Sequence, residues 1–293
     1  MKILNFGSLN IDYVYSVESF VKAGETISSK NLNLFCGGKG LNQSIAIAKA
    51  GCKVYHAGKI GIDGEMLKKE LEKAKVDTTY LLQGSGRNGH AIIQVDENGQ
   101  NSIILFGGEN ENITIEEIDK VLNGFSRGDI LLIQCEINNL DYIVNSAYEK
   151  GMKIILNPSP INEHLKSIDV SKISYLILNE VEGAELSGKD NSSDILKELI
   201  ERYAHLKIVL TLGENGVIYS EGEKRIYQGI YKTEVVDTTA AGDTFTGYFI
   251  AGLTNNWDVE QILKTASKAS SIAVSRKGAA PSIPYLEEVI TNL

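Results

Sequence analysis

Short apolar runs alternate with helical patterns over the second half of the chain. The apolar runs cover 130–133, 154–156, 175–178 and 208–210, and the helical stretches cover 114–124, 139–150, 193–204 and 258–276. Strands that are apolar throughout are covered on both faces, as in a parallel sheet between two layers of helices. The pattern therefore predicts an α/β fold of three layers, αβα, with a mostly parallel sheet.

Two further segments are rich in β-forming residues and lack a helical period. They cover 13–35 and 88–106, and the second contains Asn98-Gly99, a strong hairpin signal. We expect the two segments to pair as a small β-sheet lid on a single domain that spans residues 1–293. An apolar side of this lid facing solvent would favour a homodimer formed through it.

Residues 235–247 suggest a chemical role. Val235 and Val236 predict a short strand, and apolar residues return at helical spacing after Gly242, which predicts a tight turn and then a helix. The first N–H groups of a helix lack internal partners and carry partial positive charge, so this turn is a candidate anion site. Asp243 beside it would suit a base that takes a proton from an attacking hydroxyl. This arrangement is typical of phosphoryl transfer to an alcohol, with helix capping by Asp243 as the alternative.

A second glycine-rich segment, 36–43, leads into a helical pattern, and its Lys39 and Asn42 could bind hydroxyl groups. The spacing of a phosphate-binding P-loop is absent from the chain. Residues 84–89 match Gly-x-Gly-x-x-Gly, but a strand pattern follows them where a dinucleotide site needs a helix. The first strand, 3–6, also lacks that fingerprint, which disfavours an NAD-dependent dehydrogenase.

Composition narrows the class of protein. The chain has 29 basic and 38 acidic residues, a net charge of −9, which argues against nucleic acid or an anionic membrane as a partner. No apolar run approaches the roughly 18 residues of a membrane span, and the N-terminal apolar stretch is too short for a signal peptide. The three cysteines lack the paired spacing of disulfide or zinc sites. We therefore expect a cytoplasmic protein with reduced thiols.

Seven motifs, in this order, resemble the PfkB carbohydrate kinase family, and the ribokinases within it, over essentially the whole chain. They are GSLNID (7–12), GGKGLNQ (37–43), NPSP (157–160), NEVE (179–182), TLGENG (211–216), DTTAAGDTF (237–245) and RKGAAPSIP (276–284). The resemblance implies a ribokinase-like fold that uses ATP and Mg²⁺, with a monovalent cation, K⁺, as activator.

The resemblance also implies roles for individual residues. The catalytic positions are Asp243 as the base and the N–H groups of Ala241 and Gly242 as the site for the transferred phosphoryl group. The sugar-binding positions are Asn10, Asp12, Gly38, Lys39, Asn42, Glu136 and Asp243. The nucleotide-binding positions are Asn179, Glu182, Thr211, Gly213, Glu214, Gly216, Gly242 and Ser267, with Glu182 helping to arrange Mg²⁺. The K⁺ positions are Asp237, Thr239, Ala273, Arg276, Gly278 and Ser282, which would bind largely through backbone carbonyls.

We therefore expect ATP-dependent phosphorylation of a sugar's primary hydroxyl, with D-ribose to D-ribose 5-phosphate as the first candidate. Another acceptor, such as deoxyribose, a ketohexose or a nucleoside, is an alternative. A non-catalytic sugar-binding regulator is a further alternative, against which the intact Asp243, Lys39 and Gly242 argue.

Overall fold

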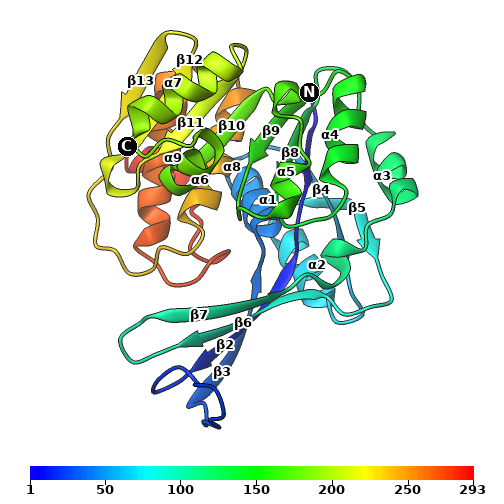
Figure 1. The fold of residues 1–293 in the computed structure, drawn as a ribbon, viewed down its shortest axis with the longest axis vertical. Coiled ribbons are helices and arrows are strands. Elements are labelled where there is room, and N and C mark those ends of the chain that lie inside the picture. Colours follow the sequence, from blue (N-terminus) through cyan, green and yellow to red (C-terminus); the bar gives the residue numbers. More distant parts are fainter.

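The computed structural model describes all 293 residues and is built on a sheet of nine strands (Figure 1). The strand order is β13-β12-β11-β10-β9-β8-β1-β4-β5, parallel from β5 to β11 and antiparallel at β12 and β13. The strands are β1 (Ile3–Phe6), β4 (Val54–Ile60), β5 (Asp77–Gln83), β8 (Ile130–Gln134), β9 (Lys153–Asn157), β10 (Tyr175–Asn179), β11 (Lys207–Thr211), β12 (Val217–Glu221) and β13 (Lys224–Gln228). The predicted mostly parallel sheet is confirmed.

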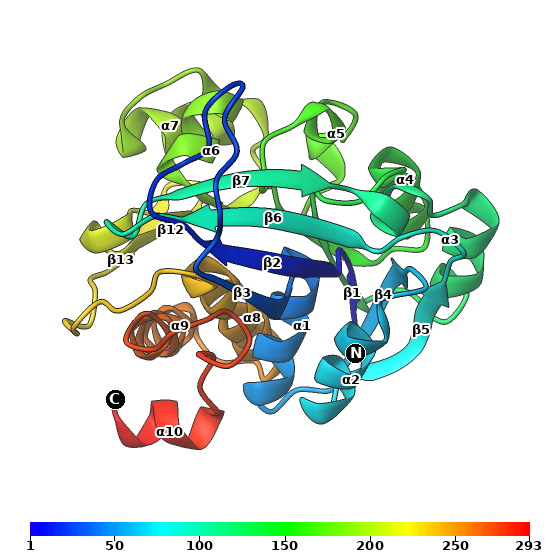
Figure 2. The ribbon, with the colours of Figure 1, turned by 90° about the horizontal axis from the view of Figure 1, so that it is seen from below.

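Helices cover both faces of this sheet and bury two separate cores (Figure 2). One layer contains α1 (Lys39–Lys49), α2 (Glu65–Lys73), α8 (Ala241–Thr254), α9 (Val259–Val274) and α10 (Leu286–Thr291). The other contains α3 (Ile115–Leu122), α4 (Leu140–Glu149), α5 (Glu163–Lys166), α6 (Glu180–Ser187) and α7 (Ser192–Arg202). Within β9, Ile155 packs in the first core and Ile154 and Leu156 in the second, which explains why the strand is apolar at its three successive central positions. The three-layer αβα prediction is therefore confirmed.

A separate sheet of four strands extends from the carboxyl edge of the main sheet (Figure 1). Its order is β3-β2-β6-β7, from β2 (Asn10–Ser16), β3 (Asn31–Gly37), β6 (Gly89–Val95) and β7 (Asn101–Phe106). As predicted, β6 and β7 form an antiparallel hairpin, in whose turn Asp96 Oδ1 accepts hydrogen bonds from the N–H groups of Asn98 and Gln100. We call this sheet the lid.

Short 3₁₀ helices complete the chain at η1 (Gly108–Glu111), η2 (Val170–Lys172) and η3 (Gly213–Asn215). None of the helices combines the length and the apolar character that crossing a bilayer requires.

The prediction of a strand at Val235 and Val236 is wrong. These residues lie in the loop between β13 and α8, where they are 63% and 47% exposed. The N–H of Val236 donates to the carbonyl of Val274 on α9, so a helix end and not a neighbouring strand holds this segment. A pair of β-branched residues favours extended backbone but supplies no strand partner.

Candidate active site

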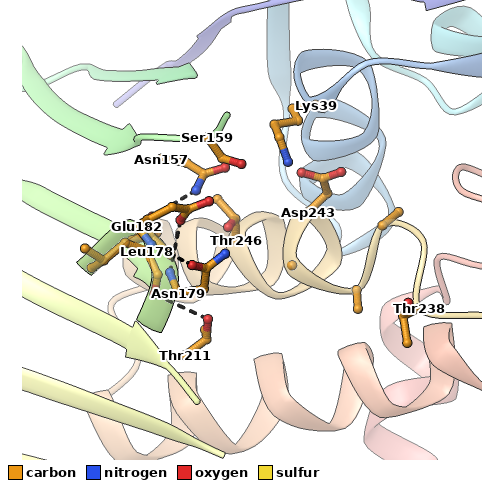
Figure 3. Close-up of a pocket in the computed structure, with 14 residues that line it drawn as sticks. Lys39, Asn157, Ser159, Leu178, Asn179, Glu182, Thr211, Thr238, Asp243 and Thr246 are labelled. Atoms are coloured by element: carbon orange, nitrogen blue, oxygen red, sulfur yellow. Dashed lines mark hydrogen bonds between the residues drawn. The ribbon is translucent and has the colours of Figure 1, made fainter. Parts of the chain in front are cut away.

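A cavity of about 250 Å³ opens between the carboxyl ends of three strands and the N-terminus of α8 (Figure 3). The strands contribute their last residues, Asn157, Asn179 and Thr211. Ligands bind at this edge in open α/β sheets. Seven of the predicted site residues line the cavity, namely Lys39, Asn179, Glu182, Thr211, Ala241, Gly242 and Asp243.

The first turn of α8 leaves two N–H groups free of protein acceptors. Ala240 takes the left-handed conformation, with φ 60°, and the N–H of Ala241 then donates to the carbonyl of Thr238 at 3.2 Å. No protein acceptor binds the N–H of Gly242 or Asp243. The predicted anion site combines the amides of Ala241 and Gly242, whereas the free amides belong to Gly242 and Asp243. The helix dipole adds partial positive charge there, so the position favours a phosphate oxygen.

Asp243 lies on the first turn of α8 and is 8% exposed. Its Oδ2 accepts a hydrogen bond from Asn42 Nδ2 at 3.1 Å, and its Oδ1 accepts one from Gln43 Nε2 at 2.9 Å. Both donors are on α1, so the packing of α1 against α8 orients the carboxylate. Neither hydrogen bond caps a helix, which disfavours the alternative that Asp243 serves only as a cap.

Lys39, the first residue of α1, directs its ammonium group toward the Asp243 carboxylate (Figure 3). Burial alone would lower the pKa of Lys39, but the carboxylates of Asp243, Glu136 and Glu182 outweigh burial and raise this pKa. The side chain is therefore a fixed positive charge at the cavity wall, and it suits a phosphate that carries negative charge.

Glu136 and Asp12 form an acidic group on the lid side of Lys39. Glu136 Oε2 accepts hydrogen bonds from the Lys39 N–H at 2.9 Å and from Ser8 Oγ. Burial raises the pKa of Glu136 despite these contacts and the Lys39 charge. Burial, and then the charge of Glu136, raise the pKa of Asp12 to about 7. Asp12 Oδ2 lies 2.1 Å from where a Cβ on Gly37 would stand, so any larger residue at 37 would displace this carboxylate.

The Asp12 carboxylate receives no hydrogen bond from any protein group, although it is largely buried. Asn42 Oδ1 is buried and likewise unpaired. Asn10 Oδ1 accepts a hydrogen bond from Asn110 Nδ2 at 2.8 Å, which fixes the Asn10 side chain. Gly38 precedes α1 with φ 94° and lets the chain turn into the helix beside these groups. The unpaired Asp12 carboxylate matches the hydroxyl donors of a sugar.

Asn179 and Glu182 form a capping box at the start of α6. Asn179 Oδ1 accepts from the Glu182 N–H at 2.9 Å, and Glu182 Oε2 accepts from the Asn179 N–H at 3.0 Å. Asn179 thus caps α6, and both side chains still line the cavity. Thr211 lies at the end of the neighbouring strand β11, and its Oγ1 donates a hydrogen bond to the Leu178 carbonyl on β10 at 3.3 Å.

The other predicted nucleotide residues lie outside this cavity. Gly213 and Glu214 are exposed on η3, and Ser267 is half-buried on α9. Gly216 has a structural reason to be glycine, because it takes φ 91° and a Cβ would lie 2.2 Å from the Gln228 carbonyl oxygen.

The predicted cation positions lie on two loops that Asp237 joins and, for Ala273, on the last turn of α9. Its Oδ1 accepts from the Thr239 N–H at 2.9 Å, and its Oδ2 accepts from the Gly278 N–H at 2.9 Å. Partial burial would raise the pKa of Asp237, but these hydrogen bonds outweigh it and lower this pKa. The side chains of Arg276 and Ser282 are also engaged, in an ion pair with Glu288 and a hydrogen bond to the Ala279 carbonyl. The carbonyl of Ala273 accepts the Arg276 N–H at 3.1 Å.

Sequence reasoning assigned no role to several buried polar residues that support the site. Gln43 and Asn157 lie beside Asp243, Asn110 fixes Asn10, and Gln134 binds Gln43. In the sequence, such a residue can be recognised as a polar amide within an apolar pattern. Gln134, which ends the buried strand β8, is an example. Such a residue needs a buried partner.

Comparisons with known proteins agree with this geometry. The chain matches the pfkB family carbohydrate kinase profile over residues 1–286. It is 33% identical to a ribokinase from Haemophilus influenzae over 98% of this chain and 96% of the relative. It is 28% identical to a deoxyribokinase from Salmonella typhi over 98% of this chain and 97% of the relative. The structure of Arabidopsis thaliana ribokinase complexed with ribose and ATP superposes with a TM-score of 0.87 at 31% identity, over 99% of this chain and 97% of the other. The chain therefore belongs to the PfkB carbohydrate kinase family.

Proposed function

We propose that this protein transfers the γ-phosphoryl group of ATP to the primary hydroxyl of D-ribose, giving D-ribose 5-phosphate and ADP. The observation that carries the proposal is the juxtaposition at one cavity of a carboxylate, two free helix amides and a lysine, at Asp243, Gly242 and Lys39. The relatives named above include a ribokinase structure with ribose and ATP, which supports the choice of sugar.

The sugar would bind between the lid and α1. Asp12 offers a carboxylate that no protein donor occupies, and Asn10 is already oriented by Asn110. Vicinal hydroxyls donate and accept at the spacing that paired carboxylate and amide groups match. This binding would place the primary hydroxyl next to Asp243.

In the transfer step, Asp243 takes the hydroxyl proton while the alkoxide oxygen forms a bond to the γ-phosphorus. The bond from that phosphorus to the β,γ-bridging oxygen breaks, and ADP leaves with the electron pair. The free N–H groups of Gly242 and Asp243, together with Lys39, would stabilise the charge on the moving group. We expect about 10² to 10⁴ in rate from the base and about 3 kcal/mol from the anion site.

Mg²⁺ fits the nucleotide end of the cavity. One oxygen of Glu182 caps Asn179 and the other receives no hydrogen bond, so a carboxylate oxygen is available in the cavity wall. Glu182 and Asn179 would hold the ion with its waters, and the bound ion would neutralise phosphate charge. Because the Asp237 carboxylate is occupied by Thr239 and Gly278, a K⁺ ion at that loop pair would bind through backbone carbonyls.

A homodimer through the lid forms part of the proposal. The apolar residues of β7 are all at least half exposed, with Ile104 62% exposed. Leu34 and Phe35 on β3 are also exposed, so apolar side chains lie on two strands of the lid. A second copy would cover this surface.

A coupled ADP-release assay tests the proposal with ribose, deoxyribose, fructose and adenosine, in potassium and in sodium buffer. We expect the highest kcat/KM for ribose, with potassium raising the rate. A preference for another acceptor would replace ribose within the same chemistry. Ribose binding with no turnover under any condition would favour the sugar-binding regulator.

A further inference from the structure

A chain of buried side-chain amides leads from the middle of the main sheet to the Asp243 carboxylate. Gln134 Nε2 donates to Asn5 Oδ1 at 3.0 Å and to Gln43 Oε1 at 2.7 Å. Gln43 Nε2 donates to Asp243 Oδ1 at 2.9 Å and to Asn157 Oδ1 at 2.8 Å. Gln43 is fully buried, so it lies behind the carboxylate and cannot contact the substrate directly.

The backbone fixes the direction of these hydrogen bonds at the sheet end. Asn5 Nδ2 donates to the carbonyl of Gly40 at 2.7 Å, and a backbone carbonyl can only accept. The Oδ1 atom of Asn5 must therefore face Gln134, which must present its amide nitrogen there. The same nitrogen then donates to the carbonyl oxygen of Gln43, and this leaves the amide nitrogen of Gln43 for Asp243.

A second backbone carbonyl fixes the direction at the other end. Asn157 Nδ2 donates to the carbonyl of Ile177 at 2.9 Å, so Asn157 Oδ1 faces Gln43 and requires a donor. Both neighbours of the Gln43 nitrogen, Asn157 Oδ1 and Asp243 Oδ1, are then acceptors. If the Gln43 amide were flipped, its carbonyl oxygen would face two acceptor oxygens and could not form a hydrogen bond with either. The flipped orientation is therefore excluded.

We propose that Gln43 is a positioning residue for phosphoryl transfer, a neutral donor that holds one oxygen of Asp243 so that the other is aligned with the sugar hydroxyl. This inference rests on the proposed role of Asp243 as the base. Asn42 holds the other oxygen, so without Gln43 a single hydrogen bond remains, about which the carboxylate can rotate. Small misplacements of a catalytic group lower the rate steeply. The loss of Gln43 should therefore lower kcat and leave substrate binding nearly unchanged.

The test is Gln43→Met, which keeps the length of the side chain and removes both polar atoms. We expect kcat to fall about 10- to 100-fold, the equivalent of one hydrogen bond to a charged group. The KM values for ribose and ATP should stay within about twofold, because Gln43 contacts neither substrate. In an Asp243→Asn background the same change should cost less than about twofold, because the positioned base is gone.

A double variant separates positioning from folding. Gln43→Met with Gln134→Met also leaves the buried Asn5 Oδ1 without its donor, so the double variant should melt below Gln43→Met alone. Its kcat should nevertheless stay as low as that of Gln43→Met. Wild-type kcat in Gln43→Met, a further fall of kcat along with stability in the double variant, or an equal loss in the Asp243→Asn background would each overturn the proposal. Full activity of Asp243→Asn itself would overturn the base, which is a distinct outcome.

Discussion

Replacing Asp12 by asparagine is expected to stabilise the ligand-free protein at alkaline pH. Burial, followed by the charge of Glu136, raises the pKa of this carboxyl from its usual 3.8 to about 7, and no protein group donates a hydrogen bond to it. The folded state therefore holds the proton more tightly than the unfolded state. Between these two pKa values, the free energy of unfolding falls as the pH rises, and above the higher value the loss is complete.

The expected size of the effect follows from the pKa difference. One pKa unit is worth about 1.4 kcal/mol, so the ionised Asp12 costs the folded protein up to about 4 kcal/mol above pH 7. At pH 5 only about 1.6 kcal/mol of this cost is present. Asparagine cannot ionise, so the stability of Asp12→Asn relative to wild type should increase by about 2 to 3 kcal/mol between pH 5 and pH 8.5.

Urea denaturation followed by circular dichroism at these two pH values measures the difference. Asp190→Asn is the matched control, because Asp190 is exposed and its side chain makes no hydrogen bond or ion pair. The control should differ from wild type by the same small amount at both pH values. A stability difference between Asp12→Asn and wild type that does not change with pH would show that ionised Asp12 does not destabilise the fold, and it would refute the reasoning.

Three further variants test other parts of the site. Asp243→Asn should lower kcat by about 10² to 10⁴ without lowering the melting temperature, and activity above about a tenth of wild type would exclude its role as the base. Gly242→Ala should fold normally, since a Cβ there meets no atom within 4 Å, but should lower kcat/KM for ATP at least about tenfold if a phosphate occupies the turn. The control is Gly247→Ala, which should lower the melting temperature, because its Cβ would stand 2.3 Å from the Cβ of Ala46. Ile104→Lys should shift the protein toward monomer in analytical ultracentrifugation, whereas Val181→Lys, on α6, should leave the mass unchanged.

The three-layer fold could be predicted because apolar periodicity reports burial directly. A strand such as β9 is apolar at successive central positions because its alternate side chains enter two different cores, at Ile155 and at Ile154. The prediction failed at Val235 because propensity describes the preferred backbone of a residue and says nothing about an available partner strand.

The candidate site could be predicted where its residues are close in sequence. The Asn179–Glu182 pair and the turn before Asp243 are local patterns, and both form as helix starts in the structure. The Gln43–Asp243 hydrogen bond joins residues 200 positions apart and depends on how α1 packs on α8. The orientation of the Gln43 amide depends in turn on backbone carbonyls in other elements, which no local pattern encodes.

The acidic residues that suit this site to a sugar also weaken the empty protein. Asp243, Glu136 and Glu182 raise the pKa of Lys39 against the effect of burial, and Asp12 adds a further carboxyl beside Glu136. Hydroxyl groups would donate hydrogen bonds to the Asp12 carboxylate that the protein itself lacks. Binding would therefore favour the ionised form of Asp12, and by linkage it would recover stability that the empty site loses as the pH rises. An alcohol can donate a hydrogen bond to the Asp12 carboxylate, whereas an apolar ligand would bury this carboxylate without a partner. The same unpaired carboxylate that limits the stability of the fold therefore selects a polyol as its ligand.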